Sequence, residues 1–141
     1  MKTSYQLERF VEAQDANGTF QAALEELRTG HKTSHWMWFV FPQVAGLGRS
    51  PMSQEYAISS IAEAKAYLEH PVLGTRLTRC ASALASTPER SAEEIFGALD
   101  AQKLQSSMTL FARADPECEV FAQVLGLYFD GAEDAATIQR L

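Results

Sequence analysis

The sequence contains few of the residues that build covalent or metal-held frameworks. Its 141 residues include two cysteines, Cys80 and Cys118, too few for a disulfide framework or a four-ligand zinc site. None of its three histidines stands in an H-E-x-x-H motif, so we expect no metal site. The glycine motifs of phosphate loops and dinucleotide folds and the G-x-S-x-G of serine hydrolases are also missing. We therefore expect no cofactor.

Long apolar runs and an excess of positive charge are missing as well. No apolar segment approaches the roughly 18 residues of a membrane span, and the first ten residues, MKTSYQLERF, lack the pattern of a secretory signal. We therefore expect a cytoplasmic protein without a membrane partner. Twelve Lys and Arg against eighteen Asp and Glu give a net charge of −6, which makes nucleic acid an unfavourable partner.

Strand-like alternation is also scarce, and helical periodicity dominates. The spacing of Leu7, Phe10 and Val11 predicts a first helix over about 4–14. Similar patterns predict helices beginning near residues 20, 60, 71, 91, 100, 116 and 134, and glycine and proline mark 44–53 as a loop. The sequences S-x-x-E at 60–63 and 91–94 have the form of capping boxes. The sequence therefore predicts an all-α fold, a compact single domain over 1–141 with about seven or eight short helices.

One segment differs from this amphipathic pattern. Trp36–Phe41 holds both tryptophans, and the surrounding Leu27–Gln54 contains no acidic residue. The apolar block suits either a short helix or a buried strand, and periodicity does not decide between them. As core, a buried tryptophan would need a partner for its indole N–H, which Gln43 or a carbonyl could supply. As a functional element, the block would form the floor of a pocket.

Two neighbouring patterns favour the functional interpretation. The glycines around Arg49 and Ser50 would let backbone N–H groups approach an anion, to which Arg49 can bind with two parallel hydrogen bonds. Lys103 and Ser107 share one face of a predicted helix, and two serines in mid-helix conflict with local helix propensity. Such local conflicts are expected at functional sites, although close helix packing would explain the serines equally well.

Several of these segments together resemble a known family. They are KTSHWMWFVFPQ (32–43), Gly46-x-Gly-x-Ser50, YAIS (56–59), AYLxHPVL (66–73) and KLxSSMTLF (103–111). They look like a family of small uncharacterised bacterial proteins of unknown function, some of which carry the misleading label "calpastatin". The resemblance covers about Leu7–Phe129 and implies a compact, mostly helical domain with no established activity. The sequence is also more distantly similar to helical enzymes that cleave N-glycosidic bonds in ADP-ribose and riboflavin intermediates. No catalytic residue of those enzymes can be assigned to a position in this sequence.

Two hypotheses follow for function, and the sequence does not decide whether the protein is an enzyme. In the first, a small anionic ligand, phosphorylated or nucleotide-like, lies between Trp36–Phe41 and the Lys103–Thr109 helix, with hydrolase or N-glycosidase chemistry as an extension. In the second, the domain is a non-catalytic adaptor for another protein, and its aromatic block is pure core. The first hypothesis assigns His35 and Asp100 to catalysis and the following residues to ligand binding: Lys32, Trp36, Trp38, Gln43, Arg49, Ser50, Lys103 and Ser107.

Overall fold

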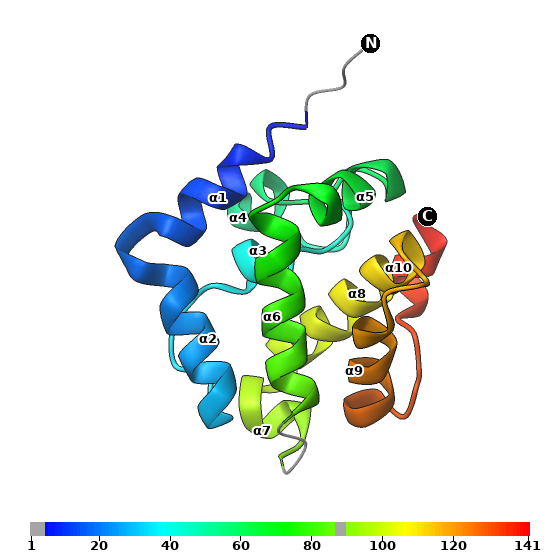
Figure 1. The fold of residues 1–141 in the computed structure, drawn as a ribbon. Coiled ribbons are helices and arrows are strands. Elements are labelled where there is room, and N and C mark those ends of the chain that lie inside the picture. Colours follow the sequence, from blue (N-terminus) through cyan, green and yellow to red (C-terminus); the bar gives the residue numbers. More distant parts are fainter. Residues whose placement is uncertain (1–4, 87–89) are drawn as a thin grey trace.

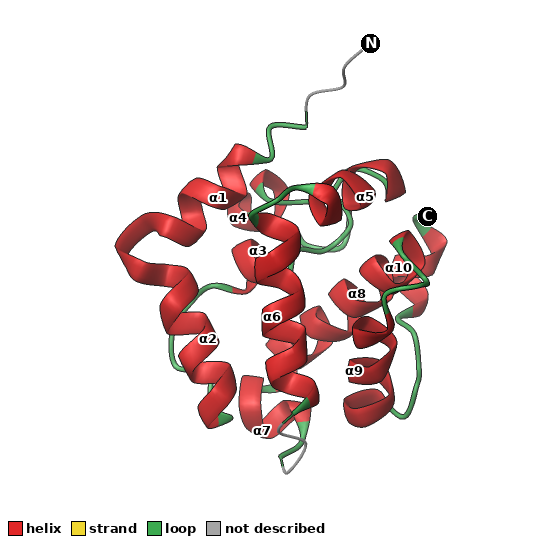
Figure 2. Cartoon of the chain, viewed as in Figure 1, coloured by secondary structure: helices red, strands yellow, loops and turns green. Residues whose placement is uncertain are grey.

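The computed structural model describes residues 5–86 and 90–141, and their secondary structure is helical (Figure 2). Apart from one isolated parallel bridge between Val44 and Ile58, the described ranges contain no β pairing. The predicted all-α class is therefore confirmed. The elements in chain order are α1 (Glu8–Asp15), the 3-10 turn η1 (Ala16–Gly18), α2 (Thr19–Thr29), α3 (Met37–Val40), α4 (Pro51–Glu55), α5 (Ile61–Glu69), α6 (Leu73–Ala85), α7 (Ala92–Phe96), α8 (Ala98–Ala114), α9 (Glu119–Phe129) and α10 (Ala135–Gln139).

Helix α6 runs through the middle of the molecule and separates two sides (Figure 1). It packs against α2, α5 and α9, while α8 packs against α5, α7, α9 and α10. Helices α2 and α10 consequently lie on opposite sides of α6 (Figure 1). Each side of α6 carries its own concave surface.

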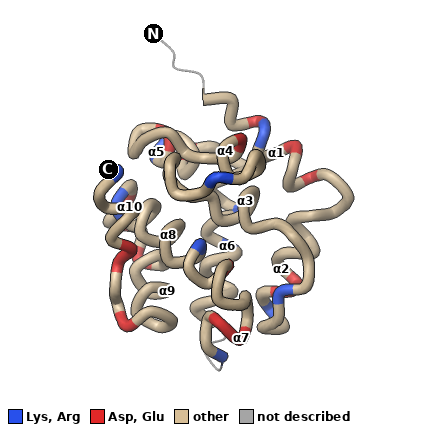
Figure 3. Tube along the Cα trace, turned by 180° about the vertical axis from the view of Figure 1, so that it is seen from behind, with Lys and Arg blue, Asp and Glu red and all other residues tan. Residues whose placement is uncertain are grey.

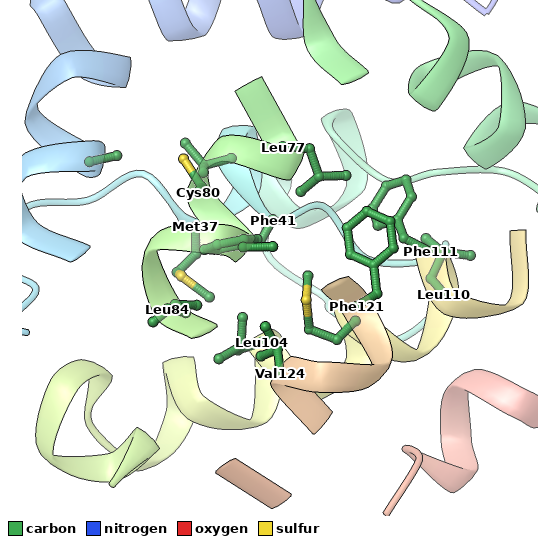
Figure 4. Packing of buried hydrophobic residues seen from close by; sticks show 14 of the residues in the cluster. Met37, Phe41, Leu77, Cys80, Leu84, Leu104, Leu110, Phe111, Phe121 and Val124 are labelled. Atoms are coloured by element: carbon green, nitrogen blue, oxygen red, sulfur yellow. The ribbon is translucent and has the colours of Figure 1, made fainter. Parts of the chain in front are cut away.

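The core lies where α3, α6, α8 and α9 meet (Figure 4). Leu104 and Phe111 of α8 and Phe121 of α9 are fully buried, and the ring centroids of Phe111 and Phe121 are 5.9 Å apart. Burial of a side chain of this size contributes about 1.5–3 kcal/mol. Such packing holds helices that are too short to be stable alone.

The ends of the helices follow local rules that were readable in the sequence. At α7 the predicted capping box is complete, since the Ser91 hydroxyl accepts from the Glu94 N–H and the Glu94 carboxylate accepts from the Ser91 N–H. At α5 only the Ser60 half forms. There the Glu63 carboxylate instead accepts from the N–H and hydroxyl of Ser59.

Two short helices modify the predicted arrangement. The apolar block forms the single helical turn α3, which settles the choice between helix and strand. The prediction of a loop over all of 44–53 was wrong at its end, where α4 begins at Pro51. Ser50 caps this helix and proline occupies its first turn, both of which are helix-start signals. The predicted start of the first helix at residue 4 lies outside the described residues, and α1 begins at Glu8.

The basic positions are spread over several elements and do not form one continuous stripe (Figure 3). An anion site must therefore be built from a few neighbouring cations. In the described ranges, no helix is long and apolar enough to cross a lipid bilayer.

Candidate functional site

The tryptophan block divides into a buried part and a partly exposed part. Trp36, Met37, Val40 and Phe41 are buried in the core, as expected for a structural element. Trp38 is only partly buried, in common with its neighbour Phe39. Because a helix has 3.6 residues per turn, the consecutive side chains of α3 point in different directions. The block therefore anchors the core and also presents Trp38 to a neighbouring surface.

The position of the tryptophan block is fixed by the carboxylate of Glu26, which lies outside the block on α2. Glu26 Oε1 accepts from Trp36 Nε1 at 2.8 Å and from the Thr33 and Ser34 N–H groups at 2.9 and 3.1 Å. Glu26 Oε2 accepts from the Ser34 hydroxyl at 2.6 Å. Burial by itself would raise the pKa of this carboxyl, but these hydrogen bonds outweigh it and lower the pKa to about 2.

Glu26 was missed in the sequence analysis, which expected Gln43 or a carbonyl to satisfy the tryptophan. The position of Glu26, directly before the acid-free segment Leu27–Gln54, was the feature of the sequence that could have indicated this role. The carboxylate fixes the segment that carries two predicted site residues, Lys32 and His35. The Lys32 N–H adds a hydrogen bond of 2.8 Å to the Ile95 carbonyl.

Lys32, Asp100 and Lys103 form a chain of alternating charges. Lys32 Nζ lies 2.9 Å from Asp100 Oδ2, and Lys103 Nζ lies 3.2 Å from Asp100 Oδ1. Each ammonium group also lies over an indole ring, Lys32 over Trp36 and Lys103 over Trp38, both at 5.2 Å from the centroid. These distances are in the range of cation–π attraction. The cluster holds two cations and one anion, so it carries one net positive charge.

Two buried polar atoms near this charge cluster have no hydrogen-bond partner in the described part of the molecule. They are the indole nitrogen of Trp38 and the hydroxyl oxygen of Ser107. Ser107 stands one helical turn after Lys103 on α8. The neighbouring hydroxyl of Ser106 instead donates to the Gln102 carbonyl of its own helix. An unpaired buried polar group costs about 1–3 kcal/mol, and such exceptions call for a functional or structural explanation.

A cleft of about 250 Å³ opens next to Lys103. Its lining comes from three segments that are distant in sequence: Gln43, Leu47, Gly48 and Ser53 before and within α4, Leu99, Gln102, Lys103 and Ser106 on α8, and Asp134 and Ala136 at the start of α10. The Asp134 carboxylate caps α10 by accepting from the N–H and hydroxyl of Thr137 at 2.9 and 2.7 Å. The described residues that line the cleft therefore include one lysine, one aspartate and several neutral polar residues.

The structure brings together six of the ten predicted site residues. Five of them, Lys32, Trp36, Trp38, Asp100 and Lys103, form the charge and indole cluster. Gln43 joins Lys103 along the cleft. Ser107 lies on the same helix, with its hydroxyl buried. The cleft residues Gln102, Ser106 and Asp134 were not predicted, because only folding places them together.

The remaining three predicted residues lie apart from this cluster. His35 is exposed, and in the described ranges it forms no hydrogen bond or ion pair, so no His35–Asp100 pair is assembled. Arg49 is exposed directly after Gly48, and its backbone carbonyl accepts from Gln54 Nε2. The Ser50 hydroxyl accepts from the Ser53 N–H as the cap of α4. Ser50 therefore has a local structural role.

Comparisons with known proteins give a family match and a similar solved structure. A family model described as "Protein of unknown function (DUF1810)" matches residues 4–141. The chain is also similar to the conserved hypothetical protein Rv1873 from Mycobacterium tuberculosis, whose crystal structure was determined at 1.38 Å. The two are 50% identical with a TM-score of 0.93, over 97% of this chain and 96% of that one. No curated protein matches.

Proposed function

The chain belongs to the DUF1810 family of proteins of unknown function, and from its site geometry we propose that it binds a small phosphorylated ligand beside Lys103. The observation that carries this proposal is the position of Lys103. Lys103 lines the cleft, and its ammonium group is shared between Asp100 and the Trp38 ring. Lys103 is therefore available to a ligand while its neighbours hold it in place.

The charge balance favours an anion at this point. Asp100 is bound by two lysines, and the Lys32 side chain is only 7% exposed, whereas that of Lys103 is 29% exposed. A phosphate near Lys103, with about −1.5 to −2 charges at neutral pH, would offset the one excess positive charge of the cluster. Attraction between opposite charges is stronger near a partly buried surface than in bulk water.

The rest of the cleft favours a ligand that also carries hydroxyl groups. Gln43, Gln102, Ser53 and Ser106 offer neutral donors and acceptors, and Asp134 offers an acceptor. Sugar hydroxyls would donate to such a carboxylate while the phosphate binds the lysine. At about 250 Å³, the cleft is slightly smaller than a typical ligand pocket of about 300–1,000 Å³. A sugar phosphate or a mononucleotide therefore fits the proposal better than a dinucleotide.

We propose binding without a reaction. Among the described residues that line the cleft there is no histidine, and Asp134 serves as a helix cap. Asp100 uses both oxygens to hold lysines. The described residues that line the cleft therefore include no acid–base pair for the hydrolase or N-glycosidase chemistry considered from the sequence.

The test is a calorimetric titration with ribose 5-phosphate, AMP and adenosine. We expect the two phosphorylated compounds to bind and adenosine to bind at least tenfold more weakly, because it lacks the group that Lys103 recognises. Lys103→Gln should weaken binding at least tenfold. Lys65→Gln, which removes an exposed cation on α5, should leave it unchanged.

Circular dichroism of both variants would show that the fold is retained. Equal affinities of the Lys103→Gln and wild-type proteins, or no binding of any phosphorylated compound, would overturn the proposal. The second outcome would favour the alternative of a non-catalytic protein-interaction domain.

A further inference from the structure

Helix α2 lies beside α6 on the side away from α10 (Figure 1). Residues of these two helices line a second concave surface. It encloses about 410 Å³ and is lined by Arg28, Thr78, Arg79, Ser82, Ala83 and Ser86. Its volume is that of a small-molecule pocket. Among the described residues, the lining contains two arginines and no carboxylate, in a chain whose net charge is −6. We refer to it as the α2–α6 groove.

The two arginines of the groove differ from three other arginines of the chain, each of which is paired with a carboxylate. Arg9, Arg76 and Arg113 each form an ion pair, with distances of 3.2, 2.8 and 2.8 Å. Within residues 5–86 and 90–141, neither Arg28 nor Arg79 does so. Their charges are therefore available to a ligand.

Neighbouring groups place the two guanidinium groups on the same side of α6. The Arg79 Cζ atom lies 5.7 Å from the Phe20 ring centroid on α2, within cation–π range. Both arginines also act on the thiol of Cys80. Burial raises the pKa of this thiol to about 12, while the charges of Arg79, Arg28 and Arg76 act in the opposite direction.

The hydroxyl groups of the groove are not equivalent. Thr78 Oγ1 donates to the Gly74 and Thr75 carbonyls, and Ser86 Oγ donates to the Ser82 carbonyl. In the described part of the chain, the Ser82 hydroxyl donates to no other group. Ser82 can therefore donate a hydrogen bond to an anion that lies between the arginines.

We propose that the α2–α6 groove binds the phosphate group of a small molecule, with Arg28 and Arg79 as its charged ligands and Ser82 as a hydroxyl donor. The planar guanidinium group binds phosphate through two parallel hydrogen bonds. One such group comes from α2 and one from α6, and the described residues that line the groove include no carboxylate that would compete for them. This site is separate from the cleft beside Lys103 and does not depend on the function proposed above.

Two features weaken the positive field of the groove. Glu25 is exposed on α2, three residues before Arg28, and Arg28 lies in the last turn of α2, where the helix dipole favours cations. Neutralising Glu25 should therefore strengthen phosphate binding, because a competing negative charge is removed. A general loss of stability would weaken binding in every variant. Stronger binding after neutralisation of Glu25 would therefore indicate an anion site.

The experiment is a ¹H–¹⁵N NMR titration of the full chain with inorganic pyrophosphate. We expect saturable shifts of the Arg79, Ser82 and Ala83 amides, and a dissociation constant at least tenfold higher in Arg28→Gln and in Arg79→Gln. Arg79→Lys should lie between wild type and Arg79→Gln, because it keeps the charge but loses the planar fork. Glu25→Gln should lower the constant, and Lys65→Gln should leave it unchanged.

The two sites are distinguished by Lys103→Gln, which should leave the shifts at α6 intact even if binding beside Lys103 is lost. The inference is overturned if the α6 amides do not shift saturably, or if Arg28→Gln and Arg79→Gln bind pyrophosphate as wild type does. In the described ranges the Arg28 side chain forms no hydrogen bond or ion pair that Gln would break, so Arg28→Gln is expected to fold.

Discussion

The Glu26 carboxylate should stabilise the protein in a pH-dependent way. Its folded-state pKa of about 2 lies below the ordinary value of 4.5, so the folded protein favours the ionised form. The stabilisation is fully present above about pH 4.5 and is lost as the pH falls toward 2. The cause is the set of hydrogen bonds from Thr33, Ser34 and Trp36.

The magnitude follows from the difference between the two pKa values. A difference of about 2.5 units at about 1.4 kcal/mol per unit gives an upper value of roughly 3 kcal/mol. Because the carboxylate is partly exposed, solvent screening reduces this to about 1–2 kcal/mol. Glu26→Gln keeps a similar shape and removes the charge, so it should lower the free energy of unfolding by this amount at pH 7.

Urea unfolding of both proteins at pH 7 and pH 3 checks the prediction. Since every other carboxyl group titrates in both proteins, the difference between them isolates Glu26. We expect that difference to fall by about half at pH 3, because the folded and unfolded pKa values bracket this pH. A difference that is the same at both pH values, or an NMR titration of Glu26 with a pKa near 4.5, would refute the reasoning.

Two further predictions concern other parts of the fold. His70 Nδ1 accepts from the Val72 N–H at 3.1 Å while His70 Nε2 lies 3.0 Å from Glu8 Oε2, so His70→Ala should cost about 1 kcal/mol of stability. His70→Asn should recover much of that loss in urea unfolding, because its carbonyl replaces the acceptor, and equal losses in the two variants would contradict the capping role. The buried Cys80, whose pKa burial raises to about 12, should not react with a thiol reagent at pH 8, whereas the partly exposed Cys118 should react. Labelling and mass spectrometry of the native protein check this, and modification of Cys80 before Cys118 would contradict it.

The helices were largely predictable because each carries its own apolar stripe or cap. The capping box at Ser91 is such a local feature, and it formed as expected. Helix α4 was missed because five residues are too few to show a periodic stripe. Its cap and proline were present in the sequence, but they stood in a segment rich in glycine.

The candidate site was predictable in its residue types and not in its geometry. Lys32, Trp38 and Lys103 were recognised from the sequence as charged and aromatic residues in unusual surroundings. Their arrangement depends on Asp100, which holds both lysines, and on Glu26, which holds the segment before α3. The pairs Lys32–Asp100 and Glu26–Trp36 join segments that are distant in sequence or separated by a loop, and periodicity carries no information about them.

The indole N–H signals of the two tryptophans offer the most direct test of phosphorylated-ligand binding beside Lys103. Trp36 donates to Glu26, whereas Trp38 has a buried indole nitrogen without a partner in the described ranges and lies under Lys103. In a ¹H–¹⁵N titration with ribose 5-phosphate, we predict a saturable shift of the Trp38 indole signal and little change at Trp36. The Lys103→Gln variant should lose the Trp38 shift. An unmoved Trp38 signal at saturating ligand, or the same shift in Lys103→Gln, would contradict the proposed site.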